Sequence, residues 1–236
     1  EAEPRRRREE LAGRFCGPVG MNARLWPLPL TLVLLLAGCS GIYYQAMEKV
    51  GFPKREILVD RVEQAQEAQT KAKEQFASAL EHFLAVTKAE GGDLQRKYDE
   101  LNREFTRSES RAKEVRDRIA AVEDVSQALF REWKQELGQY SDASLRRDSE
   151  QQLDQTRRRY DALMSLMHRA AERMEPVLAT FRDQVLYLKH NLNARAISSL
   201  GSTHRELEAD ISRLIADMEA SIREAQIFIK DLKPAG

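Results

Sequence analysis

The sequence predicts an all-α protein, namely an elongated antiparallel four-helix bundle with a projecting coiled-coil hairpin. Over nearly the whole chain behind residue 54, apolar residues recur at alternating intervals of three and four, the spacing of a seam between packed helices. The composition agrees, because 42% hydrophobic and 32% charged residues with only 11 Gly and 7 Pro are typical of long helices rimmed by solvent. Strand-like alternation of polar and apolar residues does not compete anywhere.

The first predicted helix covers residues 55–90 and ends at Gly91 and Gly92. Its seam consists of Leu58, Val62, Ala65, Gln69, Ala72, Phe76, Ala79, Phe83 and Val86. The second covers residues 93–139, with Asp93 as the N-cap because its carboxylate can accept from the first unpaired amides. Its seam consists of Leu94, Tyr98, Leu101, Phe105, Ser108, Ala112, Val115, Ile119, Val122, Ser126, Leu129 and Trp133.

The third predicted helix covers residues 142–199, beginning after a turn at Gly138 and ending at Gly201. Pro176 falls inside it and removes one backbone hydrogen bond, so we expect a kink there rather than a chain reversal. The seam consists of Leu153, Thr156, Tyr160, Leu163, Met167, Ala170, Met174, Val177, Phe181, Val185, Leu188 and Leu192.

The fourth predicted helix covers residues 203–232, and Thr203 to Glu206 have the form of a capping box. Its seam consists of His204, Leu207, Ile211, Leu214, Met218, Ile222, Ala225 and Ile229. Short turns make sequential helices antiparallel neighbours. The second and third predicted helices, roughly 70 and 80 Å long, are longer than the first and fourth, at roughly 50 and 45 Å. A two-helix hairpin of residues 125–155 should therefore project at the end where the first helix starts.

The front of the chain predicts an export signal. Residues 1–20 are an Arg-rich, patternless upstream segment that we expect not to be native, with Met21 as the natural start. Residues 21–38 then combine one positive charge, an apolar run and small residues before Cys39, the three parts of a secretory signal peptide. The apolar run is too short for a membrane-spanning helix, which needs about 20 residues.

Leu36-Ala37-Gly38-Cys39 resembles the bacterial lipoprotein box. The resemblance implies cleavage after Gly38, a diacylglyceryl group on the Cys39 thiol, and acylation of the new amino terminus, with palmitate as the expected acyl group. Two or more acyl chains would anchor the protein stably without spanning the bilayer. Ser40, rather than aspartate, follows the cysteine, so by resemblance the periplasm-facing side of the outer membrane is favoured over the inner membrane.

Residues 39–54 would form the lipidated N terminus and tether. This stretch is too aromatic for a plain flexible linker, and Gly51 and Pro53 break it before the main helices begin. We expect a short helix in it to pack on the bundle or on the membrane surface through four side chains, namely Tyr43, Tyr44, Met47 and Val50.

Charge and cysteine content restrict the function. The 38 Lys+Arg and 38 Asp+Glu residues balance, which argues against a nucleic-acid partner. Without residues 1–38 the chain has a formal charge of −2. Both cysteines, Cys16 and Cys39, lie at or before the processing point, so the mature chain has no disulfide framework.

No catalytic constellation is present, and the sequence predicts no enzyme, no metal and no cofactor. Phosphate-binding loops, nucleophile elbows and Cys-x-x-Cys pairs are missing. A di-iron bundle needs Glu-x-x-His, but Ala, Ser, Tyr and Gly stand three residues before the four histidines, which are His82, His168, His190 and His204. Each of the pairs His168–Glu172 and His204–Glu208 shares a helix face, yet a metal site needs more converging ligands.

The predicted hairpin carries the candidate surface. Its aromatic and basic residues suit a membrane interface or a partner protein. The residues are Arg131, Trp133, Lys134, Tyr140, Arg146 and Arg147. The alternative is a coiled-coil hairpin whose charges are only solvated, which is the more common arrangement.

The stretches 44–51 and 54–62 resemble the opening of an uncharacterised family of bacterial lipoproteins, the domain of unknown function 2959. The resemblance implies a helical envelope lipoprotein and assigns no functional residue except Cys39. We therefore expect a non-enzymatic, lipid-anchored periplasmic protein that is a structural or docking component of the cell envelope. Its partners would be the membrane, through the lipid anchor, and an unidentified envelope protein. The alternative is an envelope protein that binds a lipid or another apolar ligand.

Overall fold

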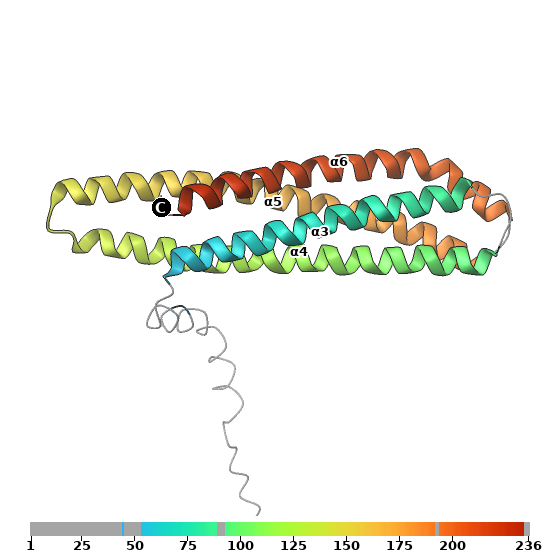
Figure 1. Ribbon diagram of the computed structural model, residues 1–236, viewed down its shortest axis with the longest axis horizontal. Coiled ribbons are helices and arrows are strands. Elements are labelled where there is room, and N and C mark those ends of the chain that lie inside the picture. The colour runs from blue at the N-terminus through green and yellow to red at the C-terminus, as the bar shows by residue number, and fades with distance from the viewer. Residues whose placement is uncertain (1–43, 45–52, 89–92, 192–193, 234–236) are drawn as a thin grey trace, which may run out of the picture. The chain divides into compact units, whose positions relative to one another are not determined.

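The computed structural model describes Tyr44 and residues 53–88, 93–191 and 194–233 (Figure 1). Four long helices follow one another in these ranges, and a 3-10 turn, η1, joins the second to the third. The elements are α3 (Lys54–Lys88), α4 (Leu94–Glu136), η1 (Leu137–Gln139), α5 (Ala143–His190) and α6 (Ala194–Leu232). The predicted all-α class is confirmed. In the described ranges, no helix combines the length and the apolar character that crossing a membrane requires.

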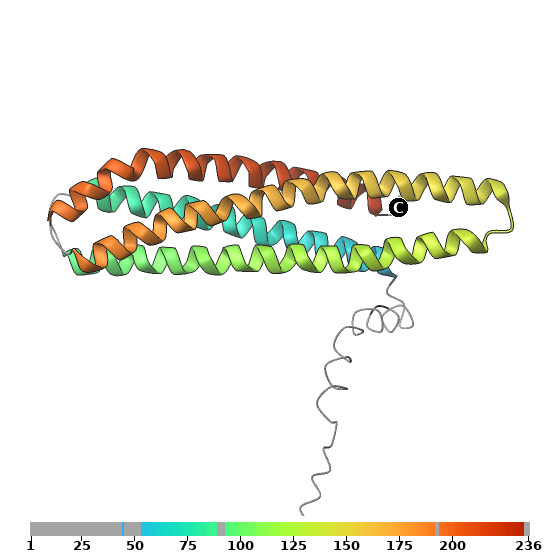
Figure 2. The ribbon, with the colours of Figure 1, turned by 180° about the vertical axis from the view of Figure 1, so that it is seen from behind.

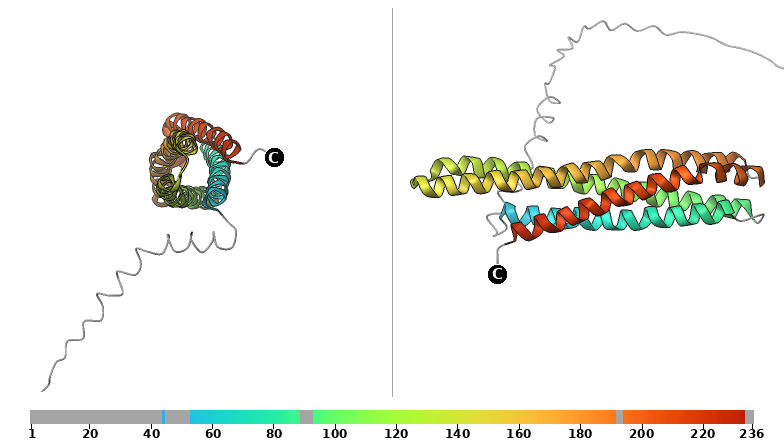
Figure 3. Two further views of the ribbon diagram at one scale, coloured as in Figure 1. Left: turned by 90° about the vertical axis from the view of Figure 1, so that its left-hand side faces the viewer. Right: turned by 90° about the horizontal axis from the view of Figure 1, so that it is seen from above.

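The four helices form one antiparallel bundle. Contacts join α3 to α4, α4 to α5, α5 to α6, and α6 back to α3. Seen end-on, the helices occupy the corners of a square, with α4 and α6 on the diagonal (Figure 3). Short turns between sequential helices produce this arrangement, as the sequence predicted.

The predicted seams form the core. All nine seam positions of α3 are buried, and Phe76 and Phe83 are fully inaccessible. Phe181 of α5 lies edge-on to Phe83, with ring centroids 6.1 Å apart, and to Phe105 at 5.9 Å. Beyond Met218, the predicted seam positions Ala225 and Ile229 of α6 are buried, whereas Ile222 is partly exposed; Ser221 and Phe228 are buried in addition.

The middle hairpin projects beyond the ends of its neighbours (Figures 1 and 2). The Nζ of Lys54, the first residue of α3, lies 2.6 Å from Oε2 of Glu132. At the end of α6, Asp231 pairs with Arg159 of α5. The two-helix part therefore runs from about residue 133 to 158, close to the predicted 125–155, and has its own small apolar cluster.

The turn between the last two helices differs from the sequence prediction. The predicted helix ends at 199 and begins again at 203, whereas α5 ends at His190 and α6 begins at Ala194. Asn191 leaves the helix with φ −130° and ψ 59°, and its side-chain Nδ2 donates to the Tyr187 carbonyl at 3.0 Å. Gly201 lies inside α6 instead of ending a helix, which costs only about 1 kcal/mol relative to alanine.

The other helix ends agree with the predicted bounds to within three residues. The helix α5 also continues through Pro176 without reversal of the chain. The Pro176 side chain is exposed, so its ring lies on the solvent side of the helix rather than in the core. The predicted signal peptide and Cys39 lie outside the described residues.

Candidate functional site

The projecting hairpin is held together by Trp133. Its indole Nε1 donates to Ser149 Oγ at 2.9 Å, across from α4 to α5. The partly exposed ring packs against a cluster of three buried residues, which are Phe130, Leu137 and Leu153. Trp133, which the sequence placed on a candidate contact surface, thus also serves the internal packing of the hairpin.

The tip of the hairpin exposes apolar surface. The Tyr140 side chain is 43% exposed, and its hydroxyl lies 3.5 Å from Ser149 Oγ. Leu145, in the first turn of α5, is 57% exposed. Sequence reasoning missed Leu145 because it precedes the seam that begins at Leu153. Its position as an isolated aliphatic residue in a polar stretch was the available signal.

The four basic residues of the predicted surface are all exposed, but they do not form a basic patch. They are Arg131, Lys134, Arg146 and Arg147. Six acidic residues accompany them between residues 131 and 154, which leaves this part of the hairpin with a formal charge of −2. One of these, Asp142, caps α5 by accepting from the backbone amides of Ser144 and Leu145 at 2.7 and 3.1 Å. The tip therefore suits a protein partner better than an anionic bilayer.

The step where α3 begins and α6 ends is hollowed. One groove of about 410 Å³ is lined by residues that include Pro53, Val59 and Leu232. A second, of about 270 Å³, adds Leu129 and Trp133 from α4. The sequence left open a function in binding an apolar ligand. These grooves are lined by both apolar and charged residues and are open to solvent, unlike the enclosed apolar cavities that usually bind such ligands.

Two histidines join helices through carboxylates. His82 Nδ1 of α3 lies 2.5 Å from Glu100 Oε1 of α4, and His168 Nε2 of α5 lies 2.8 Å from Glu123 Oε1. Glu172 lines the same surface groove as His168 without completing a metal site. Among the described residues, no group of three or more potential ligands could hold a metal ion.

Tyr44 connects the predicted tether to the bundle. Its hydroxyl donates to Asp124 Oδ2 of α4 at 2.7 Å, and its side chain is only 4% exposed. The ring belongs to the main core cluster, as expected for a tether that packs on the bundle. The other three side chains of that expectation, Tyr43, Met47 and Val50, lie outside the described residues.

The comparison with known families agrees with this architecture. A family model described as "Protein of unknown function (DUF2959)" matches residues 43–232, which covers the whole bundle and Tyr44. No curated protein and no solved structure matches the chain. Because the matched region covers most of the 236 residues, the chain belongs to the DUF2959 family of proteins of unknown function.

Proposed function

We propose that the protein is a non-enzymatic lipoprotein of the bacterial cell envelope, anchored through acyl chains on Cys39 and facing the periplasm. Its projecting hairpin docks to another envelope protein, and the outer membrane is the favoured location. Leu36-Ala37-Gly38-Cys39 supports the anchor, because a small-residue cleavage site before a cysteine is the substrate pattern of lipoprotein processing.

The observation that carries the docking role is the exposed pair at the hairpin tip, Tyr140 and Leu145. The two-helix extension buries little of its own surface, since its cluster among the described residues has three buried members. The extension lengthens the molecule and adds surface for contacts, but it contributes little to the hydrophobic core. Exposed aromatic and aliphatic residues at its end supply the kind of anchors that protein interfaces use.

The anchor is tested by replacing the acylated residue. In cells, Cys39→Ala should move the protein from the membrane fraction to the soluble fraction, and globomycin should make the uncleaved precursor accumulate. Intact mass measurement of the wild-type protein should show the acyl groups. A wild-type protein that is soluble and carries no acyl group would contradict the proposal.

The docking role is tested by photo-crosslinking in intact cells. A photoreactive amino acid at Tyr140 or Leu145 should give a discrete crosslinked band, because both side chains face solvent at the tip. The matched control is Ile227 of α6, which is 54% exposed but lies on the bundle away from the tip. Equal crosslinking at Ile227, or none at the tip, would count against docking through the hairpin.

A further inference from the structure

We infer that the bundle lies along the membrane, with the solvent face of α4 against the phospholipid headgroups. The hairpin then extends parallel to the bilayer, where it can reach a protein partner. This inference rests on the proposed lipid anchor at Cys39. Two observations point to the α4 face, namely the position of Tyr44 and the distribution of exposed charge over neighbouring helices.

Tyr44 binds α4 on its outward side. Residues of α4 that face α3 include Arg118, whose Nη1 donates to Gln64 Oε1 at 2.7 Å. Residues that face α5 include Glu123, the partner of His168. Asp124 lies between these two faces, on the side that also carries Ser110 at an interval of two heptads. The hydrogen bond therefore holds Tyr44 on the solvent side of α4.

The length of the tether limits how far Cys39 can lie from Tyr44. Cys39 precedes Tyr44 by five residues, and a fully extended chain of that length spans at most about 18 Å. The hairpin tip, at Gln139, lies about 22 Å beyond Asp124 along α4 at 1.5 Å per residue. The attachment point at Asp124 is therefore on the side of the bundle rather than at its tip. An anchor that leaves the side of α4 brings that side to the membrane.

The most exposed charges differ in sign between α3 and α4, although each helix as a whole carries equal numbers of basic and acidic residues. On α4 the exposed basic residues number seven, against three exposed acidic ones. The basic residues are Arg96, Arg103, Arg107, Lys113, Arg116, Arg131 and Lys134. On α3, residues 54–87 expose two basic and six acidic side chains. The acidic residues are Glu56, Asp60, Glu63, Glu67, Glu74 and Glu81.

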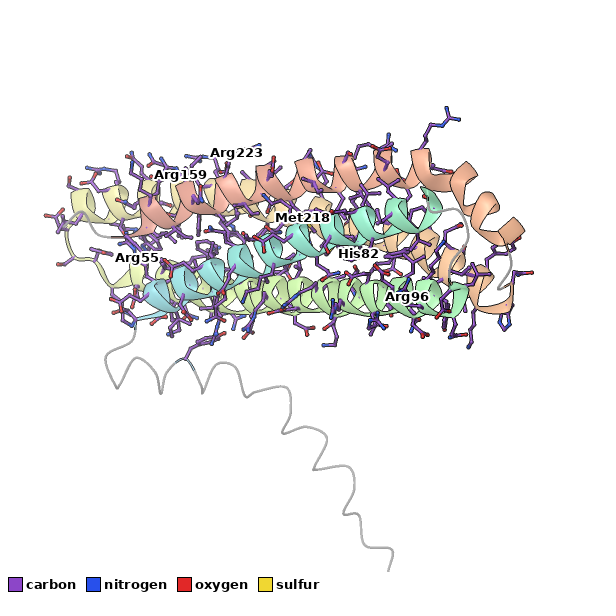
Figure 4. The ribbon with its side chains drawn as sticks, turned by 45° about the vertical axis from the view of Figure 1, so that its right-hand side comes forward. Arg55, His82, Arg96, Arg159, Met218 and Arg223 are labelled. Atoms are coloured by element: carbon purple, nitrogen blue, oxygen red, sulfur yellow. The ribbon has the colours of Figure 1, made fainter. Side chains whose placement is uncertain are left out.

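A face with excess Lys and Arg is attracted to anionic headgroups, and an acidic face is repelled. Part of the positive charge on α4 is compensated, since Arg107 pairs with Glu104, Lys113 with Asp117 and Arg116 with Glu175 of α5. Arg96, labelled in Figure 4, marks the end of α4 farthest from the hairpin, so the basic residues extend along the whole helix. The most exposed charges and the Tyr44 contact thus point to the same helix, and Asp117 and Asp124 interrupt the basic residues on its outer side.

The orientation is testable with three matched variants of the full lipoprotein. Ser110→Cys lies on the outer side of α4, Ser141→Cys at the hairpin tip, and Ser212→Cys on the diagonal helix α6; all three serines are exposed. In the mature protein the Cys39 thiol is acylated, so each variant has one reactive cysteine for a fluorophore. The labelled proteins are reconstituted into vesicles of phosphatidylethanolamine and phosphatidylglycerol that contain a headgroup-labelled nitroxide lipid.

We expect strong quenching at position 110, weaker quenching at 141 and the weakest at 212. Lipidated protein with quenching confined to position 141, or equal at 110 and 212, would overturn the inference and leave the anchor intact. A mass spectrum without acyl groups would instead contradict the proposed function, and the inference with it. Mass measurement on the same samples distinguishes the two failures.

A charge-reversal pair tests the electrostatic part. Replacing four basic residues of α4 by glutamate should reduce the quenching at position 110 toward that at position 212. These changes are Arg96→Glu, Arg103→Glu, Arg131→Glu and Lys134→Glu. The matched control changes net charge equally on α5 and α6 and should leave the quenching at position 110 unchanged. Its changes are Arg158→Glu, Arg169→Glu, Arg205→Glu and Lys230→Glu. Equal effects of the two sets would overturn the assignment of α4.

Discussion

The indole Nε1 of Trp133 donates a hydrogen bond of 2.9 Å to Ser149 Oγ, and this contact joins the two helices of the hairpin beyond the end of the bundle. The local apolar cluster is separate from the main core, so the hairpin has little other support. Regions with few buried apolar contacts open locally at lower free energy than the rest of a protein. The Trp133–Ser149 contact should therefore control the local stability of the hairpin.

We predict that Ser149→Ala lowers the free energy of local opening of the hairpin by about 1 kcal/mol, because the partly buried indole N–H loses its acceptor. Native-state hydrogen exchange should show faster exchange in residues 133–158, with α3 unchanged. Ser212→Ala is the control, since the Ser212 hydroxyl donates to the Glu208 carbonyl of its own helix and so joins no two helices. A uniform loss of protection over all four helices would contradict a local role.

The free energy of unfolding should depend on pH in the alkaline range because of Tyr160. Its ring packs on Phe130, with centroids 5.3 Å apart, at the junction of hairpin and bundle. Burial raises the pKa of the Tyr160 hydroxyl above its ordinary value of 10.0. The folded state then resists ionisation that the unfolded chain allows, so the contribution of Tyr160 to stability falls as pH rises from about 10 through the folded pKa.

We expect Tyr160→Phe to lose less stability than the wild type between pH 9 and 11, since phenylalanine keeps the ring and cannot ionise. Urea unfolding at several pH values measures this difference. Tyr187→Phe is the control, because the Tyr187 side chain is 42% exposed. Parallel stability curves for Tyr160→Phe and the wild type would contradict the assignment.

A substitution at Gly201 can distinguish a position inside α6 from the helix end that the sequence predicted. Because Gly201 lies within α6, Gly201→Ala should raise the free energy of unfolding by about 1 kcal/mol, the difference in helix propensity. At a helix C-terminus with positive φ, the same change would be destabilising. Urea unfolding measures the sign, and a destabilised Gly201→Ala would contradict the continuous helix.

This position also shows where sequence reasoning fails. The seam of α3 was predictable residue by residue, because the spacing of apolar side chains directly encodes the buried face. Gly201 and the Thr203–Glu206 pattern, in contrast, have the form of a stop and a start signal. Such local preferences are worth about 1 kcal/mol each, and tertiary packing of a long helix overrides them.

The candidate site, too, was predictable only in part. Trp133 and Tyr140 are conspicuous in a polar stretch, and the projection of the hairpin follows from helix lengths alone. The contact of Tyr44 with Asp124 joins residues 80 positions apart and leaves no mark in local spacing. The acidic face of α3 does leave such a mark, since Asp60, Glu67 and Glu74 recur at intervals of seven.

Gln69 shows that a correctly predicted seam position can still weaken the core. Its side chain is fully buried between apolar neighbours on α3, and neither Nε2 nor Oε1 has a hydrogen-bond partner among the described residues. A buried amide without partners costs about 1–3 kcal/mol. Gln69→Leu removes both polar atoms at nearly constant volume, so it should raise the free energy of unfolding by about this amount in urea titrations.

The matched control is Gln75→Leu, on the same helix. The Gln75 Nε2 donates to Glu104 Oε2 at 2.7 Å, so leucine there removes a contact between α3 and α4 and leaves a buried carboxylate with one partner fewer. We expect Gln75→Leu to lower the free energy of unfolding by about 1–2 kcal/mol. Opposite signs for two identical substitutions, six residues apart, would show that the partner rather than the residue type decides the effect. A destabilised Gln69→Leu would mean that the amide has a stabilising contact inside the core.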